Sequence, residues 1–142
     1  MKTLFLIIPI IVLISCSNDD GPQEDIQEEP EQLEISSDNL VGSWMTVQVG
    51  SDDGTATFTY RNLEENERSL IIFMENLVVT NSRIDCDGTY ELDEEARSIT
   101  YDYDCIEPVN PTSVISSLTE QELILSRGDP AGEASILILE RQ

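Results

Sequence analysis

The chain has no histidine, and its single lysine is Lys2. Histidine is the commonest side chain that acts as a base near neutral pH and the commonest metal ligand, so a serine nucleophile would lack its usual activating base. Seven basic residues stand against 29 acidic ones, which gives a formal net charge of −22. Nucleic-acid binding needs basic surface that displaces counterions. The composition therefore argues against a nucleic-acid partner.

Long apolar runs are also scarce. The run at residues 4–14 is interrupted only by Pro9 and is shorter than the roughly 20 residues that cross a bilayer. Lys2 precedes this run, and the small residue Ser15 follows it. A basic start, a short apolar core and a small residue at the cut are the parts of a secretory signal peptide. The sequence therefore predicts that residues 1–15 are removed during export.

Residues 13–16, Leu-Ile-Ser-Cys, resemble the lipobox of bacterial lipoproteins. The resemblance implies that Cys16 becomes the new N-terminus and carries fatty acyl chains such as palmitate, which anchor the protein in a membrane. Each buried methylene contributes about 0.8 kcal/mol, so two or three acyl chains hold a protein permanently. An ordinary signal peptide with an incidental cysteine is the alternative.

An acidic segment follows the expected lipidation site. Residues 17–37 contain eight acidic residues, no basic ones and only three sizeable apolar side chains. Such a segment buries too little apolar surface to offset the entropy of ordering, so we expect residues 16–37 to be a disordered tether. Residues 16–20, Cys-Ser-Asn-Asp-Asp, resemble the surface-export signal of Bacteroidota lipoproteins. This resemblance implies an outer-membrane protein that faces the cell surface. The alternative is a solvated spacer that contains no export signal.

From about residue 38 the chain changes to short apolar and β-branched runs separated by turn residues. No segment has the pattern of a long helix. The pattern predicts one antiparallel all-β domain at residues 38–142, a barrel or a sandwich, with eight or nine short strands. The expected strands lie at residues 41–49, 55–60, 70–74, 77–80, 88–92, 99–103, 114–118, 122–126 and 134–140.

Two further cysteines would reach an oxidising compartment on export, where a disulfide persists. Cys86 and Cys105 lie symmetrically about the turn of an expected hairpin. Folding the chain at that turn pairs Tyr90 with Tyr101 and sets Cys86 opposite Cys105 on the same face. We therefore predict a disulfide between the two cysteines. Two free buried thiols are the alternative.

The expected first strand opens with Gly42 and Trp44, which resemble the Gly-x-Trp signature at the start of lipocalin-like domains. A Gly-x-Tyr strand at residues 88–90 and a Leu-Thr-x-x-x-Leu segment at residues 118–123 follow in the order found in lipocalin-like lipoproteins of Bacteroidota. The resemblance implies a small antiparallel up-and-down barrel of about eight strands, either closed or incompletely closed. It also implies that Trp44 is a packing residue and that Arg141 covers it.

We expect a membrane-anchored, non-enzymatic lipoprotein whose lipocalin-like domain binds a small ligand or a protein partner without a cofactor. A filled barrel that serves as a structural or interaction subunit of an envelope complex is the alternative, and an extracellular enzyme is a third class. An eight-stranded barrel has room for its own side chains or for one small ligand. The candidates for lining a ligand are aromatic residues expected to face inward: Phe58, Tyr60, Phe73, Tyr90 and Tyr101.

Three weaker patterns point to metal binding, adhesion or glycoside hydrolysis. Asp87 would face Asp104 across the expected hairpin, but the stretch lacks the spaced oxygen ligands and terminal glutamate of a calcium loop. We therefore predict no metal site. Residues 127–129 match the integrin-binding Arg-Gly-Asp tripeptide, a match that arises often by chance. Acidic residues are too abundant for any pair to mark a glycosidase site.

Overall fold

The computed structural model describes residues 30–52, 57–84, 86–105, 111–128 and 134–142. Residues 1–29, which include the expected signal peptide and Cys16, lie outside the described residues, as does Asp129. Each expected strand overlaps one strand of the structure. The elements, in chain order, are α1 (Ser37–Leu40), β1 (Gly42–Asp52), β2 (Phe58–Asn62), the 3-10 helix η1 (Glu65–Glu67), β3 (Leu70–Phe73), β4 (Val78–Asn81), β5 (Gly88–Asp93), β6 (Ser98–Tyr103), β7 (Thr112–Leu118), β8 (Glu122–Gly128) and β9 (Ala134–Arg141).

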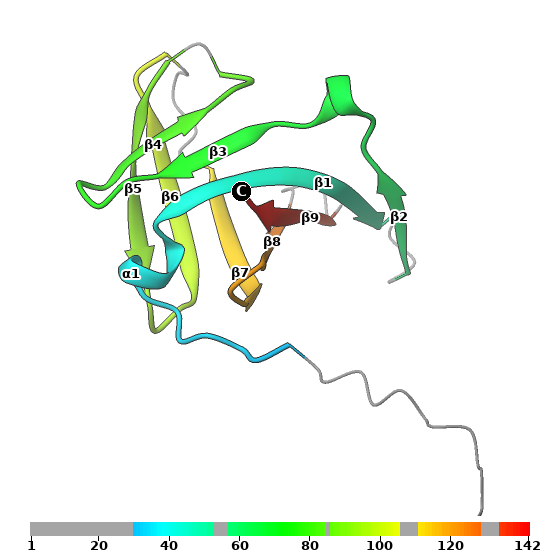
Figure 1. The fold of residues 1–142 in the computed structure, drawn as a ribbon, viewed down its shortest axis with the longest axis horizontal. Coiled ribbons are helices and arrows are strands. Elements are labelled where there is room, and N and C mark those ends of the chain that lie inside the picture. Colours follow the sequence, from blue (N-terminus) through cyan, green and yellow to red (C-terminus); the bar gives the residue numbers. More distant parts are fainter. Residues whose placement is uncertain (1–29, 53–56, 85, 106–110, 129–133) are drawn as a thin grey trace, which may run out of the picture.

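The strands form one antiparallel sheet that closes on itself (Figure 1). From β3 onward each strand pairs with the next along the chain, and β9 returns to pair with β1. Because β1 also pairs with β3, these strands make a closed eight-stranded barrel, and β2 is an extra strand alongside the second half of β1. The predicted all-β up-and-down barrel is confirmed. Its architecture is compatible with a lipocalin-like fold.

Strand β1 has three neighbours because it is long: β3 pairs with its first half, β2 with its second half, and β9 with its other edge. Its register with β9 shifts between Thr46 and Gln48, and such a bulge bends a strand and increases its twist. Beyond the bulge Val49 lines an inner cavity, whereas Gly50 lies under the ring of Tyr60. A Cβ atom added at Gly50 would lie 2.8 Å from Cε1 of Tyr60, so glycine allows this close approach of β2.

This register corrects the expected orientation of β2. Gly50 pairs with Tyr60 and Val49 pairs with Arg61, and residues directly opposite each other share a face of the sheet. Phe58 and Tyr60 therefore lie on the outer side, where Tyr60 is 50% exposed, and Arg61 lies on the cavity side. The expectation that Phe58 and Tyr60 face inward is wrong. Alternation separates two faces, but it does not say which face meets the core.

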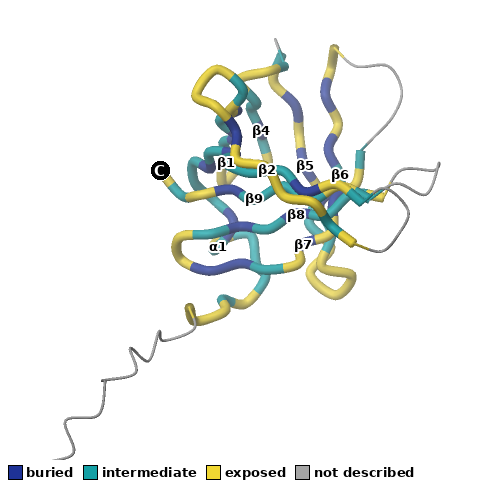
Figure 2. The backbone as a smooth tube through the Cα atoms, turned by 90° about the vertical axis from the view of Figure 1, so that its right-hand side faces the viewer, coloured by how far each residue is buried: buried dark blue, intermediate teal, exposed yellow. Residues whose placement is uncertain are grey.

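The core lies inside the barrel and draws side chains from α1 and from every barrel strand. Buried and exposed positions alternate along the strands, as in β7 (Figure 2). This alternation is expected where one face of an antiparallel sheet packs inward and the other meets water. The buried core residues are Leu40, Trp44, Ile71, Phe73, Val79, Tyr90, Ile99, Tyr101, Tyr103, Ile115, Leu118, Leu123, Leu125 and Leu139.

One end of the barrel is sealed around Trp44. The buried indole donates from Nε1 to the carbonyl of Leu40 at 2.9 Å. Arg141, which pairs directly opposite on β9, lies over the ring with its guanidinium carbon 4.3 Å from the centroid. The same guanidinium donates to the carbonyls of Val41 at 3.0 Å and Asn39 at 2.7 Å. The predicted cover of Trp44 by Arg141 is confirmed.

Gly42 is required by this seal. Its φ is +142°, a conformation that residues with a side chain rarely adopt. A Cβ atom at this position would lie 2.8 Å from Nη1 of Arg141. The glycine of the Gly-x-Trp pattern therefore makes room for the arginine that covers the tryptophan.

The residues before α1 pack along the sealed end, where the chain approaches β7 (Figure 1). The amide of Leu33 donates to the carbonyl of Leu118 at 2.8 Å, and the side chains of Leu33 and Ile35 lie against the core. Residues two apart in an extended segment point to the same side, which brings both onto the barrel. The packed part of the chain therefore begins on the N-terminal side of residue 38.

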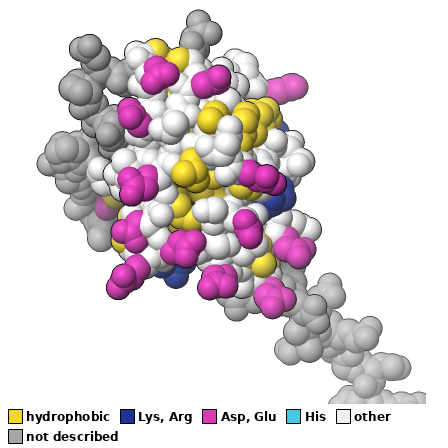
Figure 3. Space-filling view, turned by 90° about the vertical axis from the view of Figure 1, so that its left-hand side faces the viewer, with side chains coloured by type: hydrophobic (Ala, Val, Ile, Leu, Met, Phe, Trp, Pro, Cys, Tyr) yellow, Lys and Arg dark blue, Asp and Glu magenta, His cyan; other side chains and the backbone are white. Residues whose placement is uncertain are grey.

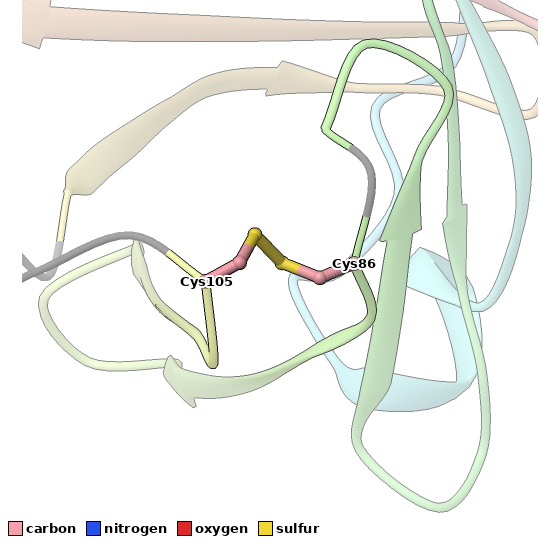
Figure 4. The surroundings of a disulfide bond; sticks show 2 residues. All are labelled: Cys86 and Cys105. Atoms are coloured by element: carbon pink, nitrogen blue, oxygen red, sulfur yellow. A yellow bond between two sulfur atoms is a disulfide. The ribbon is translucent and has the colours of Figure 1, made fainter.

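The disulfide joins the start of one hairpin strand to the end of the other (Figure 4). Cys86 precedes β5, Cys105 follows β6, and their Cα atoms are 6.1 Å apart. Between them β5 and β6 pair in the expected register, with Tyr90 opposite Tyr101. The predicted disulfide and hairpin register are both confirmed.

We predict that replacing both cysteines, Cys86→Ser with Cys105→Ser, lowers the Tm by roughly 12–24 °C. A cross-link over this sequence separation of 19 residues contributes roughly 3 kcal/mol, and about 1 kcal/mol moves the Tm of a domain of this size by about 4–8 °C. Thermal unfolding followed by circular dichroism measures the change. Reductant should lower the Tm of the natural chain only, and an equal Tm for both proteins would contradict the prediction.

We also predict that Arg141→Lys destabilises the domain by about 2 kcal/mol, since lysine cannot make the two forked hydrogen bonds and hydrogen bonds to charged groups are worth about 1.5–3 kcal/mol. Urea unfolding monitored by the fluorescence of Trp44, the single tryptophan, reports the change. Arg68→Lys is the matched control at an exposed position, with an expected effect within about 0.5 kcal/mol. Equal midpoints for the two variants would refute a sealing role for Arg141.

Candidate ligand site at the mouth of the barrel

A cavity of about 200 Å³ lies toward the end of the barrel away from Trp44. It is formed where β1 passes its bulge, where β4 and β8 end, and where the chain links β2 to β3. We call it the mouth cavity. Its lining combines charged, polar and apolar side chains: Thr46, Val49, Arg61, Leu63, Glu67, Ser69, Ile71, Asn81, Arg83, Arg127 and Leu137.

The connection between β2 and β3 forms one wall because it is bonded to β1. The amide of Leu63 donates to the carbonyl of Val47 at 2.8 Å, and the amide of Thr46 donates to the carbonyl of Ser69 at 2.9 Å. The hydroxyls of Thr46 and Ser69, both buried, lie 3.0 Å apart in a further hydrogen bond. Backbone and side-chain bonds thus hold this acidic connection at the cavity.

Glu67 positions two arginines at the cavity rim. Its Oε2 accepts from Nη1 of Arg61 at 2.6 Å and from the amide of Glu64 at 3.1 Å, the second bond belonging to the capping box of η1. Nη2 of Arg83 donates to the backbone carbonyl of Glu67. The hydrogen bond from Arg61 lowers the pKa of Glu67 below its usual value, and the same bond raises the pKa of Arg61.

Arg127 supplies a third guanidinium from the end of β8. Its Nε donates to Oγ of the buried Ser113 at 2.8 Å. Its guanidinium carbon lies 5.6 Å from the centroid of the Tyr101 ring, within the range of a cation–π contact. Arg127 is half-buried, so these two contacts fix its position in the cavity wall.

The hydroxyl of Tyr101 is buried beside this arginine. Within the described residues it completes no hydrogen bond, and a buried polar group without a partner is costly. Burial raises the pKa of Tyr101 to about 12, against the opposing effects of the Arg127 charge and the Ser113 hydroxyl. Tyr101 therefore stays neutral at physiological pH.

The aromatic residues chosen from the sequence divide into two groups. Phe73, Tyr90 and Tyr101 lie in the core, with ring centroids 5.1 Å apart for Phe73 and Tyr90 and 6.3 Å apart for Phe73 and Tyr101. They pack against one another, and the described lining of the mouth cavity does not include them. Phe58 and Tyr60 lie on the outer face. A ligand-lining role for the three core residues stays a prediction.

Sequence reasoning did not predict that the arginines of the mouth cavity share a site, and it noted Arg127 only as part of an Arg-Gly-Asp match. Arg61 belongs to a strand whose inner face was taken to be aromatic, and Arg83 and Arg127 lie at the ends of other strands. One feature of the sequence could have drawn attention to them. Basic residues are scarce in this acidic chain, so the position of each arginine is informative. Only the barrel shows that three of them meet.

Other site patterns lack support in the described part of the chain. No three cysteine, aspartate or glutamate side chains there gather closely enough to hold a metal ion. Asp87 and Asp104 are both exposed. In the same residues, no helix has the length and apolar character needed to span a membrane.

Comparison with known proteins adds no family name. The chain matches no sequence profile of a known family, and no curated protein resembles it significantly. Its likeness to lipocalin-like domains therefore rests on its own features, namely the closed barrel, the opening with Gly42 and Trp44, and the contact of Arg141 with the indole.

We predict that the stability of the domain falls as the pH rises from about 10 toward about 12. A tyrosine with a raised pKa in the folded state contributes stability that is complete below its unfolded pKa of about 10. That stability is lost as the pH rises through the folded pKa of Tyr101, about 12. Urea midpoints at pH 8 and pH 11 measure the loss.

Tyr101→Phe should lessen this alkaline loss and leave the stability at pH 7 nearly unchanged, since the hydroxyl has no described hydrogen-bond partner. Part of the loss should persist, because burial also raises the pKa of Tyr103 and of Tyr90. An identical alkaline loss in Tyr101→Phe and the natural chain would show that Tyr101 does not cause it.

Proposed function

We propose that this chain is an exported lipoprotein, anchored to the outer membrane by lipid on Cys16, whose lipocalin-like barrel binds a small ligand at its mouth. The mouth cavity carries the proposal. It lies in one end of a closed barrel whose other end is sealed by Trp44 and Arg141. A tube with a sealed end and a polar cavity at the other suits binding of a small molecule.

The position of the N-terminal segment supports a particular orientation. Residues 30–36 run along the sealed end and are bonded there through Leu33. A lipid on Cys16 would therefore tether the sealed end of the barrel to the membrane, and the mouth would face away from the membrane. The acidic residues at 16–20 support a cell-surface location.

Binding of a small ligand is favoured over a role as a docking subunit. The large exposed apolar residues of the described chain lie on separate elements, with Tyr60 on β2, Met74 and Leu77 at the β3–β4 turn and Val114 on β7. Acidic side chains surround the apolar ones on the face shown in Figure 3. Scattered apolar residues are ordinary on a soluble surface, whereas a protein interface needs a contiguous patch.

Binding is also favoured over catalysis. The chain has no histidine, and the one carboxylate in the described lining of the mouth cavity, Glu67, is paired with Arg61. A carboxylate held in an ion pair is a weaker general base than an unpaired one, because its pKa is lowered. We therefore propose a non-enzymatic protein without a cofactor.

The anchor is tested by Cys16→Ser and by inhibition of the lipoprotein signal peptidase. Either change should block processing of residues 1–15, and Cys16→Ser should in addition remove the acyl chains, because acylation needs the thiol whereas the inhibitor stops only the cleavage. Intact mass and sedimentation with membranes measure both effects. Ser15→Ala, which keeps a small residue at the cut, is the matched control and should be processed normally. Normal processing and membrane sedimentation of Cys16→Ser would refute the lipoprotein proposal.

The ligand is tested by purifying the full chain from native membranes under mild conditions and analysing it by native mass spectrometry. We expect one small molecule bound to a substantial fraction of the protein and released on unfolding. A second lipoprotein purified in the same way controls for detergent and lipid carry-over. Protein that carries only what the control carries would count against the small-ligand proposal.

A further inference from the structure

We infer that the mouth cavity is a site for the oxyanion group of a small ligand, a carboxylate or a phosphate, recognised by Arg61, Arg83 and Arg127. This inference rests on the function proposed above and names the chemical class of its ligand. It is carried by the placement of the guanidinium groups and by the size of the cavity.

Arginine is concentrated at this cavity against the trend of the whole chain. Apart from Lys2, the basic residues are six arginines, and three of them line the mouth cavity together. The described lining contains a single carboxylate, Glu67, so positive charge exceeds negative charge there. In a chain with 29 acidic residues, a locally positive cavity is the place where an anion is attracted rather than repelled.

The three guanidinium groups are held in place but retain donors for a ligand. A guanidinium presents five N–H donors in a planar fork that matches carboxylate and phosphate oxygens. Within the described residues Arg61 and Arg83 each donate to one oxygen of Glu67, and the side chain of Arg127 donates to Ser113. Such fixed groups lose less conformational entropy on binding than free arginines would.

Tyr101 packs against one of the three guanidinium groups. Its side chain is 1% exposed, and within the described residues its hydroxyl has no hydrogen-bond partner. Arg127 lies over its ring and also lines the mouth cavity. The side chains of Ser113 and Arg127 oppose the rise in the pKa of this tyrosine, so its hydroxyl belongs to the polar surroundings of Arg127 at the cavity wall.

The size of the cavity limits the ligand. A volume of about 200 Å³ equals that of roughly half a dozen water molecules and lies below the roughly 300–1,000 Å³ of pockets for drug-sized ligands. The core is filled by packed aromatic rings such as Phe73, Tyr90 and Tyr101. A long acyl chain therefore has no described space to enter, whereas a short acid or a phosphate fits.

Isothermal titration calorimetry of the full chain, purified in detergent at constant ionic strength, tests the inference. Inorganic phosphate and succinate form separate arms and distinguish the two oxyanions, and dimethyl succinate is the uncharged analogue with the same carbon skeleton. We expect saturable binding of at least one anion, with the neutral ester roughly tenfold weaker or undetectable. Equal binding of succinate and its ester would overturn the inference.

Matched variants test whether the cavity is the site. Arg83→Gln and Arg127→Gln should each weaken anion binding roughly tenfold or more. Arg83 is exposed, so its variant keeps the test valid if Arg127→Gln fails to fold. Arg97→Gln removes the same charge near β7, where Arg97 donates to the carbonyls of Ile115 and Ser116, and should leave the affinity unchanged. An equal loss in Arg97→Gln would overturn the inference in favour of a general charge effect.

The outcomes separate this inference from the proposed function. Anion binding that is lost in Arg83→Gln or Arg127→Gln supports both. An uncharged molecule recovered from native protein, together with no anion binding, overturns the oxyanion site and leaves the small-ligand function standing. Failure to recover any ligand, together with no anion binding, overturns both.

Discussion

The pairing of β1 with β9 is the contact on which the remaining structure depends, because it turns a nine-stranded sheet into a closed barrel. The paired residues run from Trp44 opposite Arg141 to Ser51 opposite Ser135. Closure leaves β1 and β9 with no open edge for another chain and creates an interior. The length of β1 lets it pair with β3 through residues 42–45 and with β2 through residues 48–52 as well.

The same pairing makes the two ends of the barrel different. At one end it sets Arg141 directly opposite Trp44, so the register that closes the sheet also brings the guanidinium over the indole. The N-terminal segment packs beside this seal. Toward the other end the bulge turns Val49 inward, and the connection between β2 and β3 is drawn against β1 to form the wall of the mouth cavity. The core between holds packed aromatic and aliphatic side chains.

Charge is used in two distinct ways. The acidic residues are spread over the surface, where they favour solubility and repel other acidic surfaces (Figure 3). The arginines instead have specific contacts. Arg141, Arg97 and Arg68 donate to backbone carbonyls, and the other three line the mouth cavity. The basic residues of this acidic chain therefore cover Trp44, contact backbone carbonyls or line the mouth cavity.

Sequence alone was sufficient for the features that local chemistry specifies. Alternating apolar residues and turn residues located the strands, the symmetry of Cys86 and Cys105 about one turn specified the hairpin register, and the Gly-x-Trp opening pointed to the barrel. These features depend on residues close together in the chain, or on a short motif that packs in one characteristic way. The export signal and the lipid anchor are predictions of the same local kind, and they remain predictions.

Tertiary structure decided which face of β2 meets the interior and which arginines meet at the mouth cavity. The period-two pattern of β2 is unchanged when the strand is turned over, and the bulge in β1 selected the face that carries Arg61. Arg83 and Arg127 reach the same cavity only because closure brings the ends of β4 and β8 near the β2–β3 connection. Residues so distant in sequence share no local signal, since their proximity is set by the register of the whole barrel.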